Sequence, residues 1–199
     1  MKITVGLTGK TGAGKSAVSA VFADRGAAVI DGDKVASGIT SRRDVLDKLC
    51  EAFGADIVVD GVLSKKTLAR KAFSSPEKTE LLNSITHPAI NAEMQRLCDE
   101  YFKTTDVCVV DAAAIIESGF AQRCDVLVTV TAPQSVRLER IMKRDGISEA
   151  DALLRINAQK SDDWYESKSD YVIVNDGLND VESVAQSVVN IVFGMTERN

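Results

Sequence analysis

The octapeptide Gly9 to Ser16, with the sequence GKTGAGKS, restricts the fold of this chain more than any other feature. It fits the pattern G-x-x-x-x-G-K-[ST], in which glycines let the backbone curl until its N–H groups point inward and form a site for anions. The pattern requires a strand before it and a helix after it. Residues 2–8 are rich in β-prone apolar side chains, and residues 15–24 carry apolar side chains at helical spacing, with Gly26 as a stop. We therefore expect a phosphate-binding loop (P-loop) between a buried strand and a helix.

Strand-like and helix-like segments alternate along the rest of the chain. The expected strands are residues 2–8, 27–31, 107–110, 125–130 and 170–174. The expected helices include residues 15–24, 45–53, 76–101, 134–144, 148–158 and 181–193. Pro88 is expected to break or kink its helix, because proline lacks an N–H group and crowds the preceding turn. The alternation predicts one α/β domain over residues 1–199, a three-layer P-loop fold with a five-stranded parallel sheet covered by helices on both faces.

Composition excludes several classes of protein. The 199 residues carry a net charge of -5, which argues against nucleic-acid binding through bulk charge, so an anionic ligand must meet a local group of cations. Four cysteines lie far apart and the chain has a single histidine, which indicates neither a zinc site nor a redox pair. No apolar run approaches the roughly 18 residues of a membrane span. We expect a cytoplasmic protein with no nucleic-acid or membrane partner.

Polar residues follow several of the expected strands where each strand ends. The P-loop follows the first strand, Asp31 and Asp33 follow the second, Asp111 ends the third, and Asn175 follows the last. In a parallel sheet, ligands bind at the carboxyl ends of the strands, where the connections diverge to opposite faces. The sequence therefore predicts a single active-site edge.

The P-loop itself predicts how a nucleotide is held. Lys15 is expected to reach the β- and γ-phosphates of ATP, and the Ser16 hydroxyl is expected to ligate Mg²⁺. The expected nucleotide-binding residues of the loop are Gly12, Ala13, Gly14, Lys15, Ser16 and Ala17. A GTPase is excluded, because the chain lacks an N-K-x-D motif for the base and three alanines follow Asp111 in place of a D-x-x-G switch. A kinase of a small metabolite fits better.

Arginines downstream of the P-loop indicate a lid. Arg137, Arg140 and Arg144 are spaced i, i+3 and i+7 and so share one face of a helix, and Arg155 follows on the next helix. Small-molecule kinases close a basic lid over the transferring phosphate, because phosphoryl transfer depends on positioning and charge neutralisation. On their own, the same arginines also fit a solvated charged face. The P-loop favours a lid, expected over approximately residues 137–160.

Two roles are open for each of two aspartates. Asp33 either forms a turn after the second strand or accepts a hydrogen bond from the hydroxyl that attacks ATP. Asp111 either caps a structural element or orients Mg²⁺ through water. A kinase that phosphorylates an alcohol benefits from a carboxylate beside the attacking hydroxyl, and Asp33 is expected one loop away from the nucleotide.

Seven segments, taken in order, resemble the dephospho-CoA kinase family over nearly the whole chain. The segments are residues 5–16, 26–33 (GAAVIDGD), 60–63 (DGVL), 85–88 (ITHP), 140–146, 155–159 (RINAQ) and 170–175 (DYVIVN). Several of them are weak signals alone, but their order is specific. The resemblance implies transfer of the ATP γ-phosphate to the ribose 3′-hydroxyl of dephospho-CoA in the presence of Mg²⁺, which gives coenzyme A and ADP.

The resemblance also implies roles for individual residues. Asp33 is implied as the base, with Lys15 and Arg140 as the other catalytic residues. Lys15 and Ser16 are implied as the ligands of the phosphates and of Mg²⁺. Arg140 and Arg144 are implied as lid cations that bind the nucleotide. Asn175 is implied as a neighbour of the adenine.

For the acceptor, the resemblance implies a helical substrate-binding subdomain over approximately residues 60–103. The positions expected to bind the acceptor are Asp33, His87, Asp111 and Glu117. His87 falls in the helical subdomain. From the sequence alone, a histidine with satisfied hydrogen bonds at a helix end is the favoured role for it.

Two positions depart from the family pattern. Lys10 stands where the family usually has glycine, which adds a cation near the nucleotide and removes no N–H group. Residues 111–119, DAAAIIESG, stand where the family typically has a proline followed by two leucines, an aromatic residue and a glutamate, although Glu117 and Gly119 match. Two alternatives therefore stay open: a P-loop kinase of another small alcohol or nucleotide, and an ATP-binding regulatory module without catalytic activity.

Overall fold

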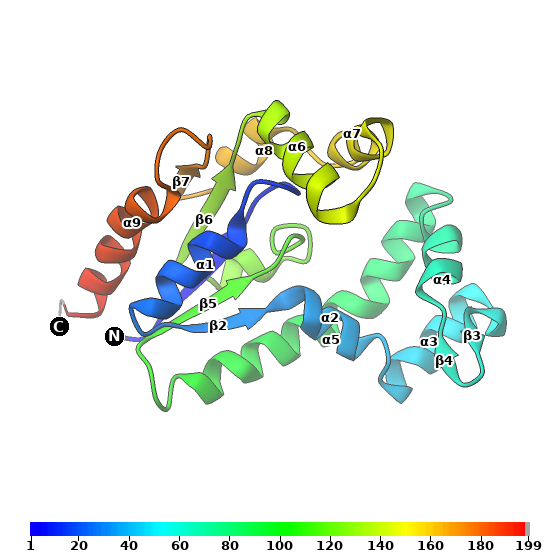
Figure 1. The fold of residues 1–199 in the computed structure, drawn as a ribbon. Helices are drawn as coiled ribbons and strands as arrows, with labels where there is room; N and C mark the ends of the chain where they lie inside the picture. Colours follow the sequence, from blue (N-terminus) through cyan, green and yellow to red (C-terminus); the bar gives the residue numbers. More distant parts are fainter. Residues whose placement is uncertain (198–199) are drawn as a thin grey trace. The chain divides into compact units, whose positions relative to one another are not determined.

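The structure, a computed structural model, describes residues 1–197. The chain forms two compact units, whose elements are labelled in Figure 1. The sheet unit comprises Met1–Asp31 and Cys98–Asn199, and the helical unit comprises Gly32–Leu97. Over the described residues, the helices include none that is long and apolar enough to cross a lipid bilayer.

The sheet unit contains the five-stranded parallel sheet that the sequence predicts (Figure 1). The strands are β1 (Ile3–Thr8), β2 (Ala28–Asp31), β5 (Val107–Asp111), β6 (Val126–Thr131) and β7 (Tyr171–Val174). Their order is β2-β5-β1-β6-β7, so β1 lies in the middle, and all six of its residues are buried. The chain leaves β1 toward one side of the sheet and later crosses from β5 to β6 on the other side of β1. The connections therefore diverge at the carboxyl end of β1, where the P-loop begins.

Helices cover both faces of this sheet. The helices of the unit are α1 (Lys15–Asp24), η2 (Phe120–Arg123), α6 (Gln134–Asp145), α7 (Glu149–Asn157), α8 (Asp162–Glu166), α9 (Val181–Thr196) and the end of α5 (Pro76–Tyr101). On one face α1 and α9 share a buried core with β1, and Val107 of β5 belongs to it. The next residue, Cys108, faces the other side, because successive strand residues alternate. There its Sγ lies 3.6 Å from the Sγ of Cys98 in the last turn of α5.

The segment after β6 contains two helices with a small core of their own. Ile141 of α6 packs with Ala152 and Ile156 of α7, and all three are buried. This pair falls within the segment expected as a lid, and its role as a lid stays a prediction. The short helix α8 follows, with Ser161 as its N-cap. The sequence does not predict α8, because five residues are too few for a periodic pattern.

The helical unit consists of short helices and one hairpin. Its elements are α2 (Gly32–Ile39), α3 (Arg43–Phe53), η1 (Ala55–Ile57), β3 (Val58–Val59), β4 (Val62–Leu63), α4 (Lys65–Ala72) and the greater part of α5. The antiparallel strands β3 and β4 are joined by Asp60 and Gly61, both with positive φ (51° and 79°). An Asp-Gly pair with this backbone fits the type I′ turn that the twist of a hairpin favours. The sequence pattern predicts neither α2 nor the hairpin, since both are short.

Of the two outcomes predicted for Pro88, a break or a kink of its helix, the break does not occur. Helix α5 runs for 26 residues and holds Pro88 inside it. A proline in a helix interior costs about 3 kcal/mol, because one N–H hydrogen bond is lost and the ring crowds the preceding turn. The turns after Pro88 bury Ile90 and Met94. Burial of two large apolar side chains contributes roughly 1.5–3 kcal/mol each, which is enough to offset the proline.

Candidate active site

The P-loop is held tightly against the elements that follow it in the chain. Gly9, Gly12 and Gly14 have φ values of 142°, 80° and 93°, a region that side chains rarely adopt. A Cβ at Gly9 would overlap a backbone carbonyl of β6, and one at Gly12 would lie 2.8 Å from the Arg137 carbonyl oxygen. A Cβ at Gly14 would overlap the Asn175 side-chain amide. Each of these glycines is therefore required by both backbone conformation and space.

The N-terminus of α1 is prepared to receive an anion. Gly14 is its N-cap, no side chain caps it, and its first turn has no acidic residue. Four helices are capped by the side chains of Ser64, Ser148, Ser161 and Asp180, whereas α3 and α6, like α1, have no side-chain cap. A helix start has N–H groups without partners inside the helix and carries the positive end of the helix dipole. Such a helix start is suited to a phosphate group. In the first turn of α1, Lys15 donates through Nζ to the Gly9 carbonyl oxygen (3.5 Å).

Arg140 and Asn175 lie against the outer, carbonyl side of the P-loop. The buried Asn175 amide donates through Nδ2 to the Ala13 carbonyl oxygen (2.9 Å), and its Oδ1 accepts from Arg140 Nη2 (3.0 Å). Arg140 Nη1 lies 3.3 Å from the Gly12 carbonyl oxygen and 3.4 Å from that of Ala13. With these carbonyl groups bonded from outside, the loop's N–H groups can face inward. Two residues predicted from separate segments are thus brought together with the loop.

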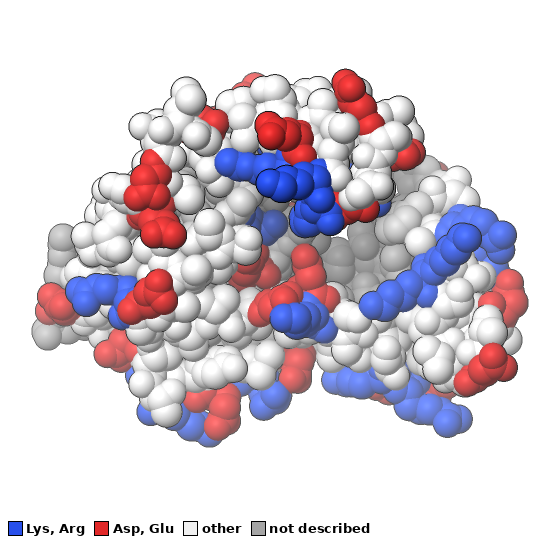
Figure 2. Space-filling view, in the orientation of Figure 1, with Lys and Arg blue, Asp and Glu red and all other residues white. Residues whose placement is uncertain are grey.

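The three arginines of α6 do not share one environment. Arg137 is only 2% exposed, and it donates through Nε to the Ala132 carbonyl oxygen (2.9 Å). Arg144 is exposed and pairs with the neighbouring Asp145, whose pKa it lowers chiefly through their hydrogen bonds. Figure 2 shows Lys and Arg side chains gathered at the surface over α6. Arg137 is therefore held in the interior of the sheet unit, whereas Arg144 lies at its surface. The role of Arg140 and Arg144 as lid cations stays a prediction.

Two aspartates lie side by side at the ends of β2 and β5. Asp31 and Asp111 are paired in register, and Asp111 Oδ2 accepts a hydrogen bond from Ser19 Oγ of α1 (2.6 Å). Ser16 and Ser19 are three residues apart and share a face of α1. The Ser16 hydroxyl and the Asp111 carboxylate therefore lie at the same edge of the sheet. Hydroxyl, carboxylate and phosphate oxygens are the ligands that Mg²⁺ prefers, so these residues fit that ion.

The helical unit contains a pocket of about 260 Å³ beside Asp33. Asp33 is exposed in the first turn of α2. The other residues that line the pocket are Ala36, Ser37, Thr40, Leu63, Lys65, Leu68, Ala69, Phe73 and Leu82. Leucine, alanine and phenylalanine side chains give it apolar walls, and Lys65 Nζ donates to Ser37 Oγ (2.6 Å) at its polar side. The sequence does not reveal the pocket, because it depends on α2 and on contacts among three helices.

His87 lies inside α5, and not at a helix end as expected. It is partly buried, and burial lowers the pKa of its imidazole. The neutral form is therefore favoured near pH 7, so that a contact with a ligand would be a hydrogen bond rather than an ion pair.

Comparisons with known proteins connect this geometry to a family. The family model described as dephospho-CoA kinase matches residues 3–180. The chain belongs to the dephospho-CoA kinase family. A dephospho-CoA kinase of Corynebacterium jeikeium is 38% identical over 94% of this chain and 96% of its own, and that of Corynebacterium diphtheriae is 39% identical over 89% and 90%. The solved structure of a dephospho-CoA kinase from Campylobacter jejuni has the same fold, with a TM-score of 0.71, 24% identity and coverage of 98% of this chain and 99% of that one.

The segment where this chain departs from the family pattern contacts a partner that the sequence does not indicate. Glu117 is exposed after β5 and accepts a long hydrogen bond from the hydroxyl of Tyr165 in α8 (3.4 Å). Tyr165 is only 3% exposed, and burial raises the pKa of its hydroxyl to about 12, with Glu117 adding to the shift. The phenol therefore keeps its proton and donates to the carboxylate. No motif marks Tyr165, since the contact joins residues 48 positions apart.

Proposed function

We propose that the protein transfers the γ-phosphate of ATP to the ribose 3′-hydroxyl of dephospho-CoA, giving coenzyme A and ADP. The observation that carries the proposal is the uncapped N-terminus of α1 behind a P-loop fixed by Arg140 and Asn175, in a chain of the dephospho-CoA kinase family. We place this reaction in the cytoplasm, where ATP and a water-soluble acceptor meet.

In the proposed complex the triphosphate lies along the P-loop. Backbone N–H groups between Gly12 and Ala17 donate hydrogen bonds to the phosphates, except those of Ala13 and Ala17, which donate to the carbonyl oxygens of Lys10 and Gly14 (3.1 Å each). Lys15 neutralises charge on the β- and γ-phosphates. Arg140 and Arg144 add positive charge from α6, and Asn175 lies beside the adenine. Ser16 holds Mg²⁺, with Asp111 at the same edge, and the bound ion contributes neutralisation of the phosphate oxygens. Fixed donors aimed at developing charge typically contribute about 10²–10³-fold in rate each.

The acceptor is proposed to lie against the helical unit. Asp33 accepts the proton of the 3′-hydroxyl as that oxygen attacks phosphorus. The apolar pocket beside Asp33 suits the methylene and amide groups of the pantetheine arm. His87 and Glu117 are proposed as further acceptor-binding residues, the first as a neutral hydrogen-bonding partner.

The direct test is an assay of the purified protein with MgATP and dephospho-CoA, with coenzyme A separated by chromatography. Lys15→Met serves as the control, because it removes the phosphate-binding ammonium. Formation of coenzyme A by the wild type and its absence in the control support the proposal.

Two other outcomes point to the alternatives. Faster turnover of shikimate, gluconate or a nucleoside monophosphate would indicate a kinase of another small molecule. The altered segment 111–119 motivates that test. Tight ATP binding without transfer to any acceptor would indicate a regulatory module.

A further inference from the structure

Lys10 belongs to a group of charges with two buried cations and one partly exposed carboxylate, that of Asp162, whose side chain is 38% exposed. The side chain of Lys10 is 9% exposed, and its Nζ lies 3.5 Å from Asp162 Oδ2 at the start of α8. The same carboxylate oxygen lies 3.3 Å from Nη2 of Arg137, whose side chain is 2% exposed. The hydroxyl of Thr131 donates to the other oxygen of Asp162 (3.4 Å). Two buried cations from the P-loop and α6 thus share one carboxylate.

Asp162 supplies the negative charge that faces the buried ammonium group of Lys10. A buried ammonium group without a carboxylate is strongly unfavourable, because desolvation is not compensated. Arg137 keeps a second partner in the Ala132 carbonyl oxygen. The carboxylate that forms an ion pair with Lys10 is that of Asp162.

Lys10 also begins the tight turn of the P-loop. The N–H of Ala13 donates to the Lys10 carbonyl oxygen (3.1 Å), so the position of Lys10 sets that of the turn. The N–H of Thr11 donates to Gln159 Oε1 (2.8 Å), just after helix α7. The side chain of Lys10 and the backbone of Thr11 therefore both attach the loop to the segment 159–162.

We propose that Lys10 is a positioning residue, whose ammonium group, held by Asp162, fixes the turn over residues 10–13 in the form that binds phosphate and ties it to the segment after α7. The inference rests on the proposed function, because it takes ATP as the ligand of the P-loop. The Lys10–Asp162 pair distinguishes this chain from the family pattern, which usually has glycine at position 10.

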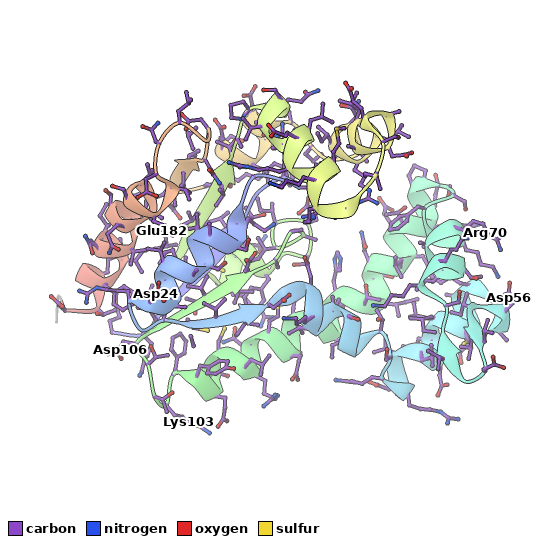
Figure 3. The ribbon with its side chains drawn as sticks, in the orientation of Figure 1. Asp24, Asp56, Arg70, Lys103, Asp106 and Glu182 are labelled. Carbon is purple, nitrogen blue, oxygen red and sulfur yellow. The ribbon has the colours of Figure 1, made fainter. Side chains whose placement is uncertain are left out.

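The test compares Lys10→Met, Lys10→Arg, Asp162→Asn and the double variant Lys10→Met/Asp162→Asn. Lys103→Met is the matched control, because Lys103 forms an exposed ion pair with Glu100 (2.8 Å) and lies at the opposite end of the sheet unit from the P-loop (Figure 3). Calorimetric titration with ATP gives the Kd, the coupled assay gives KM and kcat, and thermal unfolding gives Tm.

We expect Lys10→Met to raise the Kd and KM for ATP about threefold to tenfold, with a smaller change in kcat, because a contact within one network is lost. Lys10→Arg should stay within about twofold of wild type, and Lys103→Met should not differ from it. Lys10→Met should lower Tm in the wild-type background. In the Asp162→Asn background it should raise Tm, because it removes one of two cations left without a carboxylate.

ATP affinity of Lys10→Met equal to that of wild type would overturn the inference, as would a fall in Tm of the same size in both backgrounds. If Asp162→Asn does not fold, the ATP affinities of Lys10→Met and Lys10→Arg decide. A wild-type protein that binds no ATP contradicts the proposed function instead, so the two failures are distinguishable.

Discussion

Replacement of Asn175 by alanine tests how much of the P-loop's shape depends on a side chain far away in the sequence. The variant loses the bond from Nδ2 to the Ala13 carbonyl oxygen (2.9 Å) and the bond from Arg140 to Oδ1 (3.0 Å). A neutral buried hydrogen bond contributes about 1 kcal/mol and one to a charged group about 1.5–3 kcal/mol. Arg140 keeps its contacts with the Gly12 and Ala13 carbonyl groups, which limits the loss. We expect the free energy of unfolding to fall by about 2–4 kcal/mol.

Urea unfolding followed by circular dichroism measures this change, and titration with ATP measures its effect on the site. Asn190→Ala is the control, because Asn190 is exposed on α9 and its side chain accepts an exposed hydrogen bond from Gln186 (2.9 Å). We expect the control to change the free energy of unfolding by less than about 0.5 kcal/mol. Equal effects of the two substitutions, or unchanged ATP affinity of Asn175→Ala, would refute the claim that Asn175 supports the loop.

Three further predictions concern single residues. Asp33→Asn should abolish turnover while ATP affinity stays nearly intact, and a near-wild-type rate would exclude Asp33 as the base. Gly9→Ala should abolish ATP binding in a titration, because φ of 142° and the overlap with β6 exclude a Cβ; Gly194→Ala, in an open position on α9, is the control. His87→Gln should remove a pH dependence: burial lowers the pKa of His87, so the unfolded state binds more protons, and wild type should lose stability relative to the variant as pH falls from 7 to 5. A constant difference in Tm across that range would contradict this.

The features that could be predicted from the sequence are those with local signals. β1 is an apolar run before glycines, and α1 has apolar residues at helical spacing, so both appear at the expected places with the P-loop between them. The carboxyl ends of β2 and β5 could be predicted in the same way, because each apolar run in the sequence stops at an aspartate, Asp31 or Asp111. Parallel pairing then brings the two carboxylates together without further information.

The features that could not be predicted depend on contacts between distant segments. The spacing of Arg137 and Arg140 gives the face of a helix but not its neighbours, and the Ala132 carbonyl oxygen and Asp162 bury the first of them. The pocket beside Asp33 needs α2, which has too few residues for a periodic pattern. Pro88 stays helical because burial further along the helix outweighs a local preference.

The uncapped start of α1 has a consequence for the protein without nucleotide. In α4, α7, α8 and α9 a serine or aspartate side chain occupies the first N–H groups, whereas at α1, as at α3 and α6, they are left to solvent. The first turn of α1 is therefore a place where amide hydrogens exchange with solvent more readily than in the middle of the helix. A bound triphosphate accepts hydrogen bonds from these N–H groups, as a cap side chain does in other helices. Ligand binding therefore also caps α1. Protection of these few amides against deuterium exchange should rise with ATP in proportion to its occupancy of the loop.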